Sequence, residues 1–358
     1  MTRTKVAILY GGRSVEHGVS INSARNIVQY IDKENFEPLP IGISQSGQWF
    51  LTTGVSKEIE QGKQLHLQLD PNHPAFLTNE GEATLADIVF PVLHGTDGED
   101  GSVQGLLKSL ELPIVGTGVL GSSMSMNKLV SKRMLQQAGL PVTPYLFNSF
   151  GNTSFSFEEV KEQLGLPFMV KSASLGSSVG VSKVKSKTDF AKAVEESFRY
   201  DNGVLFEEFI QGREIECAIL GNYPPQASLP GEIVISKKYE FYSFDAKYVD
   251  GEAVRIEVPA RLDPAQKEQI QDLSVKAYQT LCCEDFARVD LFLTANNKVY
   301  INEINTIPGF TNSSMFPMMW NERGIPFTAL ITRLIELAFE RFGKSKRIER
   351  DFLSSLKF

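Results

Sequence analysis

The spacing of hydrophobic residues changes early in the chain, from a continuous run to a helical period. Residues 5–10 (KVAILY) form a short apolar run that predicts a buried strand, and the apolar positions from Ile21 to Ile31 keep helical spacing. The turn between them, GGRSVEHGVS, is rich in glycine. A strand, a glycine-rich turn and a helix in this order are typical of α/β proteins, which tolerate anions at such helix N-termini.

Glu16 lies in this turn, and two interpretations of it stay open. A carboxylate at the start of a helix is favourable for the helix dipole alone. It could equally hold an ammonium or a hydroxyl group of a ligand. The turn lacks the G-x-G-x-x-G spacing, which disfavours a nicotinamide-dependent oxidoreductase.

A second apolar strand, ADIVFPVLHG, reaches His94, and the chain from Gly95 to Gly101 contains three glycines. Open α/β sheets bind ligands at the carboxyl ends of their strands, so His94 is a candidate site residue. A structural role for this single histidine is an equally good interpretation. Residues 52–83, before the strand, are predicted to form a polar insertion.

A second unit begins near Gly121, and its strand around Lys171 runs into a loop of glycines and serines at 176–180. Backbone N–H groups and serine hydroxyls bond phosphate oxygens while a lysine supplies charge, so phosphate contact is one hypothesis for this loop. A flexible turn is the competing interpretation. No G-K-[ST] follows, so the loop is not a Walker A motif. The elements that follow predict an antiparallel α+β unit.

The third unit contains a long, aromatic and charged loop at residues 237–260. Loops of this length are uncommon in compact domains and typically act as lids or binding loops. A helix is predicted from Pro264 to Leu281, and a closing helix is predicted over residues 326–343.

Between these two helices, residues 287–305 (ARVDLFLTANNKVYINEIN) predict a β-hairpin. Apolar and polar residues alternate on both sides of Asn296-Asn297, a pair that suits a two-residue turn. With that turn, Asp290 pairs with Glu303 across the two strands. Carboxylates that face each other repel and weaken a sheet.

A divalent cation between Asp290 and Glu303 would remove this repulsion. The same register places Arg288 opposite Asn305 on the same face of the hairpin. Ligand oxygens from Asp, Glu and Asn favour Mg²⁺, which uses a few carboxylates together with substrate phosphates. A solvated hairpin face with an accidental acidic pair is the competing interpretation.

Composition narrows the class of protein. The 358 residues, of which 42% are hydrophobic and 22% charged, suit a globular protein of two or three domains. A net charge of −7 argues against binding to nucleic acid or to an acidic membrane surface. Three cysteines provide neither a disulfide framework nor metal-ligand spacing, and no stretch approaches membrane-spanning length. A cytoplasmic location is expected.

Six motifs occur in order along nearly the whole chain: GGRSVEHGVS, HGTDGEDGSVQG, the Lys171 strand with LGSSVG, FDAKY, ARVDLF and NEINTIPGFTNSS. Each is modestly specific alone, but the ordered set is very specific. Over residues 4–340 the chain resembles the D-alanine–D-alanine ligases of the ATP-grasp superfamily.

The resemblance implies an ATP-grasp fold that combines α/β and α+β parts. An N-terminal Rossmann-like α/β domain is expected at 1–120, and a small antiparallel ATP-grasp subdomain at 121–212. A C-terminal α+β domain is expected at 213–358, with a lid at 237–260. ATP is expected between the last two domains.

The resemblance also implies site residues. The expected hydrogen-bonded set around the first D-alanine is Glu16, Ser177 and Tyr248. Its carboxylate region is assigned to His94, and the oxyanion to Arg288 with the Gly309 N–H group. Ser314 is assigned to the second D-alanine, and Lys247 to the lid. The expected ATP contacts are Lys128, Lys171, Glu207, Ile210 and Glu214. Two Mg²⁺ ions, replaceable by Mn²⁺, are expected at Asp290, Glu303 and Asn305.

The implied reaction joins two D-alanines at the expense of ATP through a D-alanyl phosphate, for peptidoglycan precursors, in a cytoplasmic homodimer. A relative with D-lactate or D-serine as second substrate is the alternative. Tyr248 favours D-alanine, because this lid position differs in related depsipeptide-forming ligases. A nucleotide-binding module without catalysis is disfavoured, because Arg288, Asp290 and Glu303 are all present.

Overall fold

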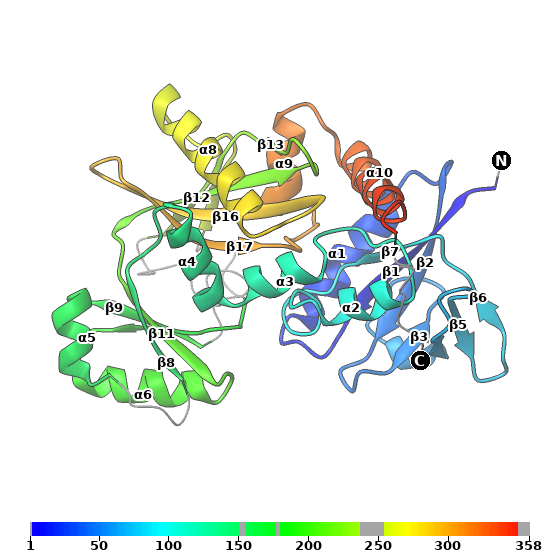
Figure 1. The fold of residues 1–358 in the computed structure, drawn as a ribbon, viewed down its shortest axis with the longest axis horizontal. Coiled ribbons are helices and arrows are strands. Elements are labelled where there is room, and N and C mark those ends of the chain that lie inside the picture. The colour runs from blue at the N-terminus through cyan, green and yellow to red at the C-terminus, as the bar shows by residue number, and fades with distance from the viewer. Residues whose placement is uncertain (1, 150–154, 177–179, 237–253, 350–358) are drawn as a thin grey trace, which may run out of the picture.

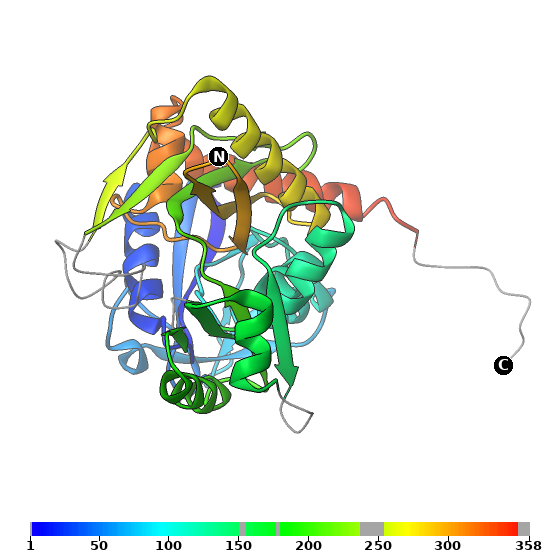
Figure 2. The same ribbon diagram turned by 90° about the vertical axis from the view of Figure 1, so that its left-hand side faces the viewer.

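The computed structural model describes residues 2–149, 155–176, 180–236 and 254–349, whose strands form three sheets (Figure 1, Figure 2). The N-terminal sheet has seven strands in the order β6-β5-β4-β3-β2-β1-β7. Its strands are β1 Thr4–Gly11, β2 Phe36–Ile43, β3 Trp49–Leu51, β4 Lys63–Gln68, β5 Ala75–Thr78, β6 Ala83–Thr84 and β7 Ile88–Pro91. Only β1 with β2 and β1 with β7 pair in parallel among these described strands.

The first apolar run is buried because helices cover both faces of β1. Val6, Ile8 and Tyr10 point into a core shared with α1 (His17–Tyr30) and α10 (Phe327–Ser345). Ala7 and Leu9 point to the other face, against α2 (Ser102–Ser109). Because both faces of β1 are covered, its sequence is a continuous apolar run rather than an alternation of apolar and polar residues. The last helix of the chain thus packs on the first sheet (Figure 1).

Residues 52–83 do not form the insertion that their polarity predicts. They contain a 3₁₀ turn, Ile59–Gln61, and contribute β4, β5 and the start of β6 to the antiparallel side of the sheet. Leu65 is the one buried side chain of β4, so the segment carries too few apolar residues to be predicted as a strand.

The four-stranded sheet is antiparallel throughout, as predicted, in the order β10-β9-β11-β8. Lys171 lies on its strand β9. The strands and the covering helices are β8 Tyr145–Ser149, α5 Phe157–Leu164, β9 Phe168–Ser172, β10 Val181–Val184, α6 Lys187–Phe198 and β11 Gly203–Glu208. A capping box between Ser156 and Glu159 starts α5.

The third sheet has the order β15-β14-β12-β16-β17, with the short strand β13 on β12. Its elements are β12 Gly212–Leu220, β13 Gln226–Ala227, β14 Gly231–Ile235, β15 Val254–Glu257, α8 Pro264–Thr280, β16 Phe286–Thr294, β17 Val299–Asn305 and α9 Met315–Glu322. The predicted helix at 264 is confirmed, with Asp263 as its N-cap. Two helices that precede the four-stranded sheet, α3 Val119–Met126 and α4 Lys128–Gln137, lie between the sheets (Figure 1).

The hairpin of β16 and β17 has the predicted residue pairing at Asp290, but its turn length and its strand regularity differ from the prediction. Asp290 pairs with Glu303, and Arg288 with Asn305. The turn, however, contains three residues, because the Thr294 N–H group bonds the Lys298 carbonyl at 2.9 Å. The two-residue turn was therefore wrong. A β-bulge beside Asp290 leaves Asn302 unpaired and restores the register that the longer turn had shifted.

Candidate functional site

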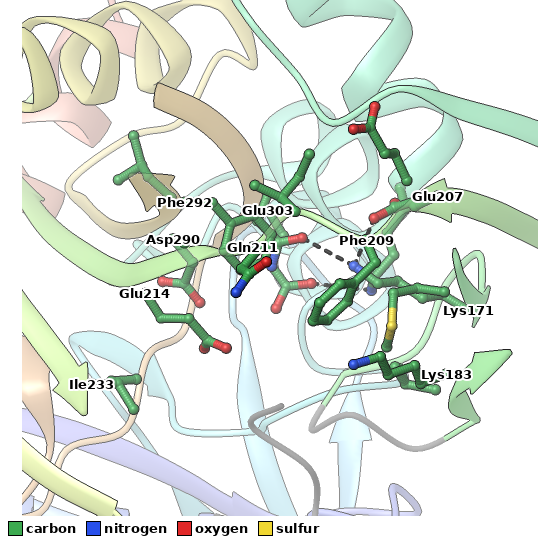
Figure 3. A pocket seen from close by; sticks show the side chains of 18 of the residues that line it. Lys171, Lys183, Glu207, Phe209, Gln211, Glu214, Ile233, Asp290, Phe292 and Glu303 are labelled. Atoms are coloured by element: carbon green, nitrogen blue, oxygen red, sulfur yellow. Dashed lines mark hydrogen bonds and ion pairs between the residues drawn. The ribbon is translucent and has the colours of Figure 1, made fainter. Parts of the chain in front are cut away.

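A cleft of about 580 Å³ lies between the four-stranded sheet and the third sheet (Figure 3). Its walls come from β9, β10 and β11 on one side and from β12, β14, β16 and β17 on the other. Its volume suits a small-molecule ligand. The lining includes all five residues expected to contact ATP and two of the three expected to hold metal: Lys128, Lys171, Glu207, Ile210, Glu214, Asp290 and Glu303.

Three buried charged residues, Lys132, Lys171 and Glu207, form a cleft cluster in which Lys171 and Glu207 line the cleft and Lys132 lies behind them. The Lys171 Nζ atom donates to Glu207 Oε2 at 2.7 Å and to Asn302 Oδ1 at 3.1 Å. The other Glu207 oxygen, Oε1, lies 3.1 Å from Lys132 Nζ, and both of these side chains are only 1% exposed. One carboxylate is therefore shared between two lysines.

These ion pairs oppose the effect of burial on each pKa. Burial alone raises the pKa of Glu207, but the charges of Lys132 and Lys171 outweigh it and lower the pKa below its usual value. Burial lowers the pKa of Lys171, yet the Glu207 charge raises it overall. For Lys132 burial prevails, and its pKa is lowered despite Glu207.

A row of carboxylates crosses the third sheet at the edge of the cleft. Glu216 on β12 pairs with Asp290 on β16, which in turn pairs with Glu303 on β17. Arg288 balances this row: its Nε and Nη2 atoms donate to the two Asp290 oxygens at 2.7 and 2.8 Å, and Nε lies 2.9 Å from Glu216 Oε2. The repulsion predicted for this face is thus relieved by a guanidinium group.

Lys128 connects the carboxylate row with Leu175, which directly precedes the glycine-serine loop at 176–180. Its Nζ atom lies 3.3 Å from Glu303 Oε2 and donates to the Leu175 carbonyl oxygen at 2.5 Å. Asn305 donates from Nδ2 to Asp290 Oδ2 at 2.9 Å. The β-bulge turns the Asn302 amide oxygen toward Lys171. Lys128 and Lys171 therefore both contact β17, the strand that carries Glu303 and pairs with Asp290.

The predicted metal residues have suitable chemistry and lie next to one another on the paired strands β16 and β17. Within the described residues, no group of three or more His, Cys, Asp or Glu side chains is placed to hold a metal ion. Asp290, Glu303 and Asn305 nevertheless supply only oxygen ligands, which a hard cation prefers. Such a cation would take its remaining ligands from phosphate and water.

A second group of residues, the junction cluster, consists of Glu16, Ser23, His94 and Glu99 of the N-terminal part. Glu16 is 8% exposed and precedes α1, which starts at His17. Its carboxylate leaves no room beside two glycines: a Cβ atom would lie 2.7 Å from Glu16 Oε2 at Gly95 and 2.8 Å at Gly176. The first glycine-rich turn thus meets the glycine-serine loop of the four-stranded sheet.

His94 and Glu99 hold the backbone of Ile307, just after β17. The His94 Nδ1 atom lies 2.8 Å from the Ile307 carbonyl oxygen, and Nε2 lies 2.9 Å from Ser23 Oγ. Both ring nitrogens therefore have protein partners. Glu99 Oε1 accepts from the Ile307 N–H group at 2.9 Å, and Oε2 accepts from the Gly95 N–H group at 2.7 Å.

Burial dominates the ionisation of the junction cluster. It raises the pKa of Glu99 to about 8, and the negative charge of Glu16 adds to this effect. Burial lowers the pKa of His94, against the opposing charge of Glu16. A neutral His94 is consistent with its two hydrogen-bond partners.

The loop after Ile307 carries the last two predicted residues. Gly309 lies close to Ser314, since a Cβ atom there would meet Ser314 Oγ at 2.8 Å. Ser314 precedes α9 and its hydroxyl accepts from the Thr311 N–H group at 3.0 Å. Phe310 anchors the loop in an aromatic core with Phe286.

Three predicted site residues, Ser177, Lys247 and Tyr248, lie outside the described residues, as does most of the predicted lid. Five described residues at the site were not predicted: Ser23, Glu99, Lys132, Glu216 and Asn302. The alternation of Glu214 and Glu216 on one strand was an available signal. Asn302 could not be predicted because its orientation depends on the bulge. Lys132 could not be predicted because its position resembles any polar position of a helix.

Comparison with known proteins gives consistent matches along the chain. A model of the D-ala D-ala ligase N-terminus matches residues 5–117, and one of the D-ala D-ala ligase C-terminus matches residues 134–336. D-alanine–D-alanine ligase A of Escherichia coli (strain K12) is 46% identical over 98% of this chain and 99% of its own length. The D-alanine–D-alanine ligase of Shouchella clausii is 44% identical over 98% of each.

Solved structures give the same picture. The D-alanine-D-alanine ligase from Coxiella burnetii superposes with a TM-score of 0.85 at 37% identity, covering 97% of both chains. The VanG D-Ala:D-Ser ligase from Enterococcus faecalis also has a TM-score of 0.85, at 33% identity, covering 94% of this chain and all of that one.

Among the described helices, none has the length and apolar character needed to span a membrane.

Proposed function

The chain belongs to the D-alanine–D-alanine ligase family, and from this membership we propose how the cleft and the junction cluster divide the reaction. It is an ATP-dependent enzyme that joins D-alanine to D-alanine. We assign ATP to the cleft and the first D-alanine to the space beside Glu16. One observation carries this assignment: Gly176 lines the cleft and also lies against the Glu16 carboxylate, so the two sites share a boundary.

In the proposed cleft, Lys128 and Lys171 hold the ATP phosphates, while the adenine and ribose lie against Glu207, Ile210 and Glu214. Support comes from the lining of the cleft, which includes all five residues. Two ammonium groups at one end suit phosphate charge, and apolar side chains such as Met169 and Phe209 suit a purine base.

We further propose two Mg²⁺ ions, with Mn²⁺ as a substitute, at Asp290, Glu303 and Asn305. When bound, they would neutralise charge on the transferring phosphate. Arg288 donates to both Asp290 oxygens, and Oδ1 has a further lone pair that a cation could use. The same guanidinium group is proposed for the oxyanion.

The chemistry requires activation of a carboxylate. A free carboxylate is a poor electrophile, because attack adds charge to an anion. Transfer of the γ-phosphoryl group of ATP to the first D-alanine forms an acyl phosphate, and the amine of the second D-alanine then expels phosphate. We assign the first D-alanine to Glu16, Ser177 and Tyr248. The tetrahedral oxyanion is assigned to Arg288 and the Gly309 N–H group.

The proposed role of His94 is support of the first substrate's carboxylate region through Ile307, since both of its ring nitrogens already have partners. Glu99 acts on the same peptide group, and together they position the loop that carries Gly309. The second D-alanine is assigned to Ser314 at the start of α9, where free backbone N–H groups favour a carboxylate. Lys247 is proposed to act from the lid, which keeps water from the acyl phosphate.

The remaining assignments are also proposals. We infer a cytoplasmic homodimer, as the family resemblance implies, and domain limits at 1–120, 121–212 and 213–358 with a lid at 237–260. The three sheets support these limits, since each falls within one of them apart from Gly212, the first residue of β12. Sedimentation of the purified protein tests the dimer.

Release of ADP tests the reaction and its second substrate. D-alanine, D-lactate and D-serine are offered in turn with D-alanine and ATP, and D-alanine is expected to give the fastest release. No ADP release with D-alanine would contradict the proposal. Replacement of one metal ligand, Glu303→Gln, is expected to abolish turnover without unfolding the protein, as circular dichroism checks. Retained turnover would refute the metal assignment.

A further inference from the structure

Lys132 is a fully buried member of the cleft cluster, and the proposed mechanism gives it no role. It lies on α4, is 1% exposed, and is absent from the lining of the cleft. A buried ammonium group is costly unless it is paired. The carboxylate that pairs with it, Glu207, belongs to the proposed ATP site.

The position of α4 explains how this lysine reaches the cluster. Leu129 of α4 packs with Ala173 and Leu205 of the four-stranded sheet. Leu135, six residues further along the helix, packs in the core of the third sheet. The helix therefore packs against both sheets that form the walls of the cleft, and Lys132 lies between Leu129 and Leu135 along it.

The charges of the cluster depend on Lys132. Two ammonium groups and one carboxylate leave one positive charge, and this charge faces the cleft on Lys171, whose side chain is 10% exposed. Without Lys132, Glu207 and Lys171 form a neutral pair. Both Glu207 oxygens would then turn to Lys171, the only ammonium group left in the cluster, and draw it away from a phosphate.

We propose that Lys132 is a positioning residue of the ATP site. It holds one oxygen of Glu207 from behind, so that Lys171 keeps an uncompensated charge for the phosphates. This inference rests on the proposed binding of ATP in the cleft. Lys132 does not itself reach the nucleotide, and all of its effect passes through Glu207.

Steady-state kinetics of Lys132→Met tests the inference in the full-length enzyme. The KM for ATP is expected to rise about 10- to 100-fold, the range for loss of a hydrogen bond to a charged group. The KM for D-alanine stays within about twofold, because Lys132 contacts nothing at the junction cluster. The acid limb of kcat/KM for ATP moves to higher pH, because Glu207 loses a charge that lowers its pKa.

Leu135→Ala is the matched control for lost stability. It lies on the same helix and removes buried volume without changing charge, so its Tm falls while the KM for ATP stays unchanged. An unchanged KM for ATP in Lys132→Met would overturn the proposal, as would an equal rise in Leu135→Ala. If Lys132→Met does not fold, Lys132→Gln retains an N–H donor of similar length without charge and decides the same question.

Lys171→Met separates this inference from the function on which it rests. If Lys171→Met raises the KM for ATP and Lys132→Met does not, only the positioning role is wrong. If neither variant changes the KM for ATP, the assignment of ATP to the cleft is wrong as well.

Discussion

Glu207 in the cleft is buried and Glu99 at the junction is half-buried, and their surroundings shift their pKa values in opposite directions. Glu207 has an ammonium group on each oxygen, and its pKa is lowered. Glu99 has a backbone N–H group on each oxygen and a second carboxylate, Glu16, nearby, and its pKa is raised to about 8. Full charges outweigh burial, whereas two peptide dipoles do not.

The difference separates two kinds of site. In the cleft the pKa of Glu207 is lowered and that of Lys171 is raised, so both of these lining residues keep their charges at physiological pH, as a phosphate-binding site requires. The junction cluster contains a carboxylate that titrates near neutral pH and that holds the backbone of Ile307. We therefore expect substitutions in the cleft to affect ATP, and substitutions at the junction to affect D-alanine and the pH dependence.

The largest effect is expected from Lys171→Met, which removes the charge that faces the cleft. Turnover should fall about 10²- to 10³-fold, as when one donor that stabilises transition-state charge is removed. Initial rates of ADP release over a range of ATP concentrations measure the change. The KM for D-alanine serves as the internal control, and an equal change in both KM values would contradict the division between cleft and junction.

A smaller effect is expected from Gly95→Ala at the junction. Its φ of +77° costs about 1–2 kcal/mol for an L-residue, and the new Cβ atom would also press on Glu16 Oε2 at 2.7 Å. Displacement of this carboxylate should raise the KM for D-alanine about tenfold, the effect of roughly 1.4 kcal/mol. Kinetics with saturating ATP measure it.

Gly139→Ala is the matched control for that substitution. Gly139 has nearly the same φ, +73°, but nothing lies within 4 Å of a Cβ atom there. It should lose a similar free energy of unfolding and keep both KM values. Should Gly139→Ala impair D-alanine use as much as Gly95→Ala, backbone strain rather than contact with Glu16 would explain the loss.

A further effect is expected in the pH dependence of stability. Because the folded pKa of Glu99, about 8, is raised above its unfolded value, the folded state binds the extra proton, and stability falls as pH rises toward 8. From pH 6.5 to 8 the loss is at most about 2 kcal/mol, at about 1.4 kcal/mol per pH unit. Thermal unfolding of Glu99→Gln should lack this decline.

The measurement has to stay above about pH 6.5, because the titration of His94 changes stability with pH in the opposite direction to that of Glu99. The pKa of His94 is lowered, so its contribution to stability is lost as pH falls below about 6.5, its ordinary value. Above that pH only Glu99 of the pair changes charge. A decline between pH 6.5 and 8 that persists in Glu99→Gln would show that other groups cause it.

Much of the third sheet was predictable because its signals are local. Alternation along 287–305 identified the hairpin, and a period of two then placed Asp290 opposite Glu303. The turn length was wrong by one residue, and the bulge beside Asp290 compensated for it. A bulge depends on how neighbouring strands twist and pack, which alternation does not encode.

Sequence alone determined which residues carry charge and where glycines give the backbone conformational freedom. The candidate site followed from the order of the motifs, from Lys171 on its strand and from the glycine-rich turn that contains Glu16. Only the tertiary structure decided their partners. Lys132 meets Glu207, Glu99 meets Ile307, and Arg288 relieves the facing carboxylates of the hairpin. These contacts join residues from different elements, and their energies depend on burial and distance, which exist only once the sheets have packed.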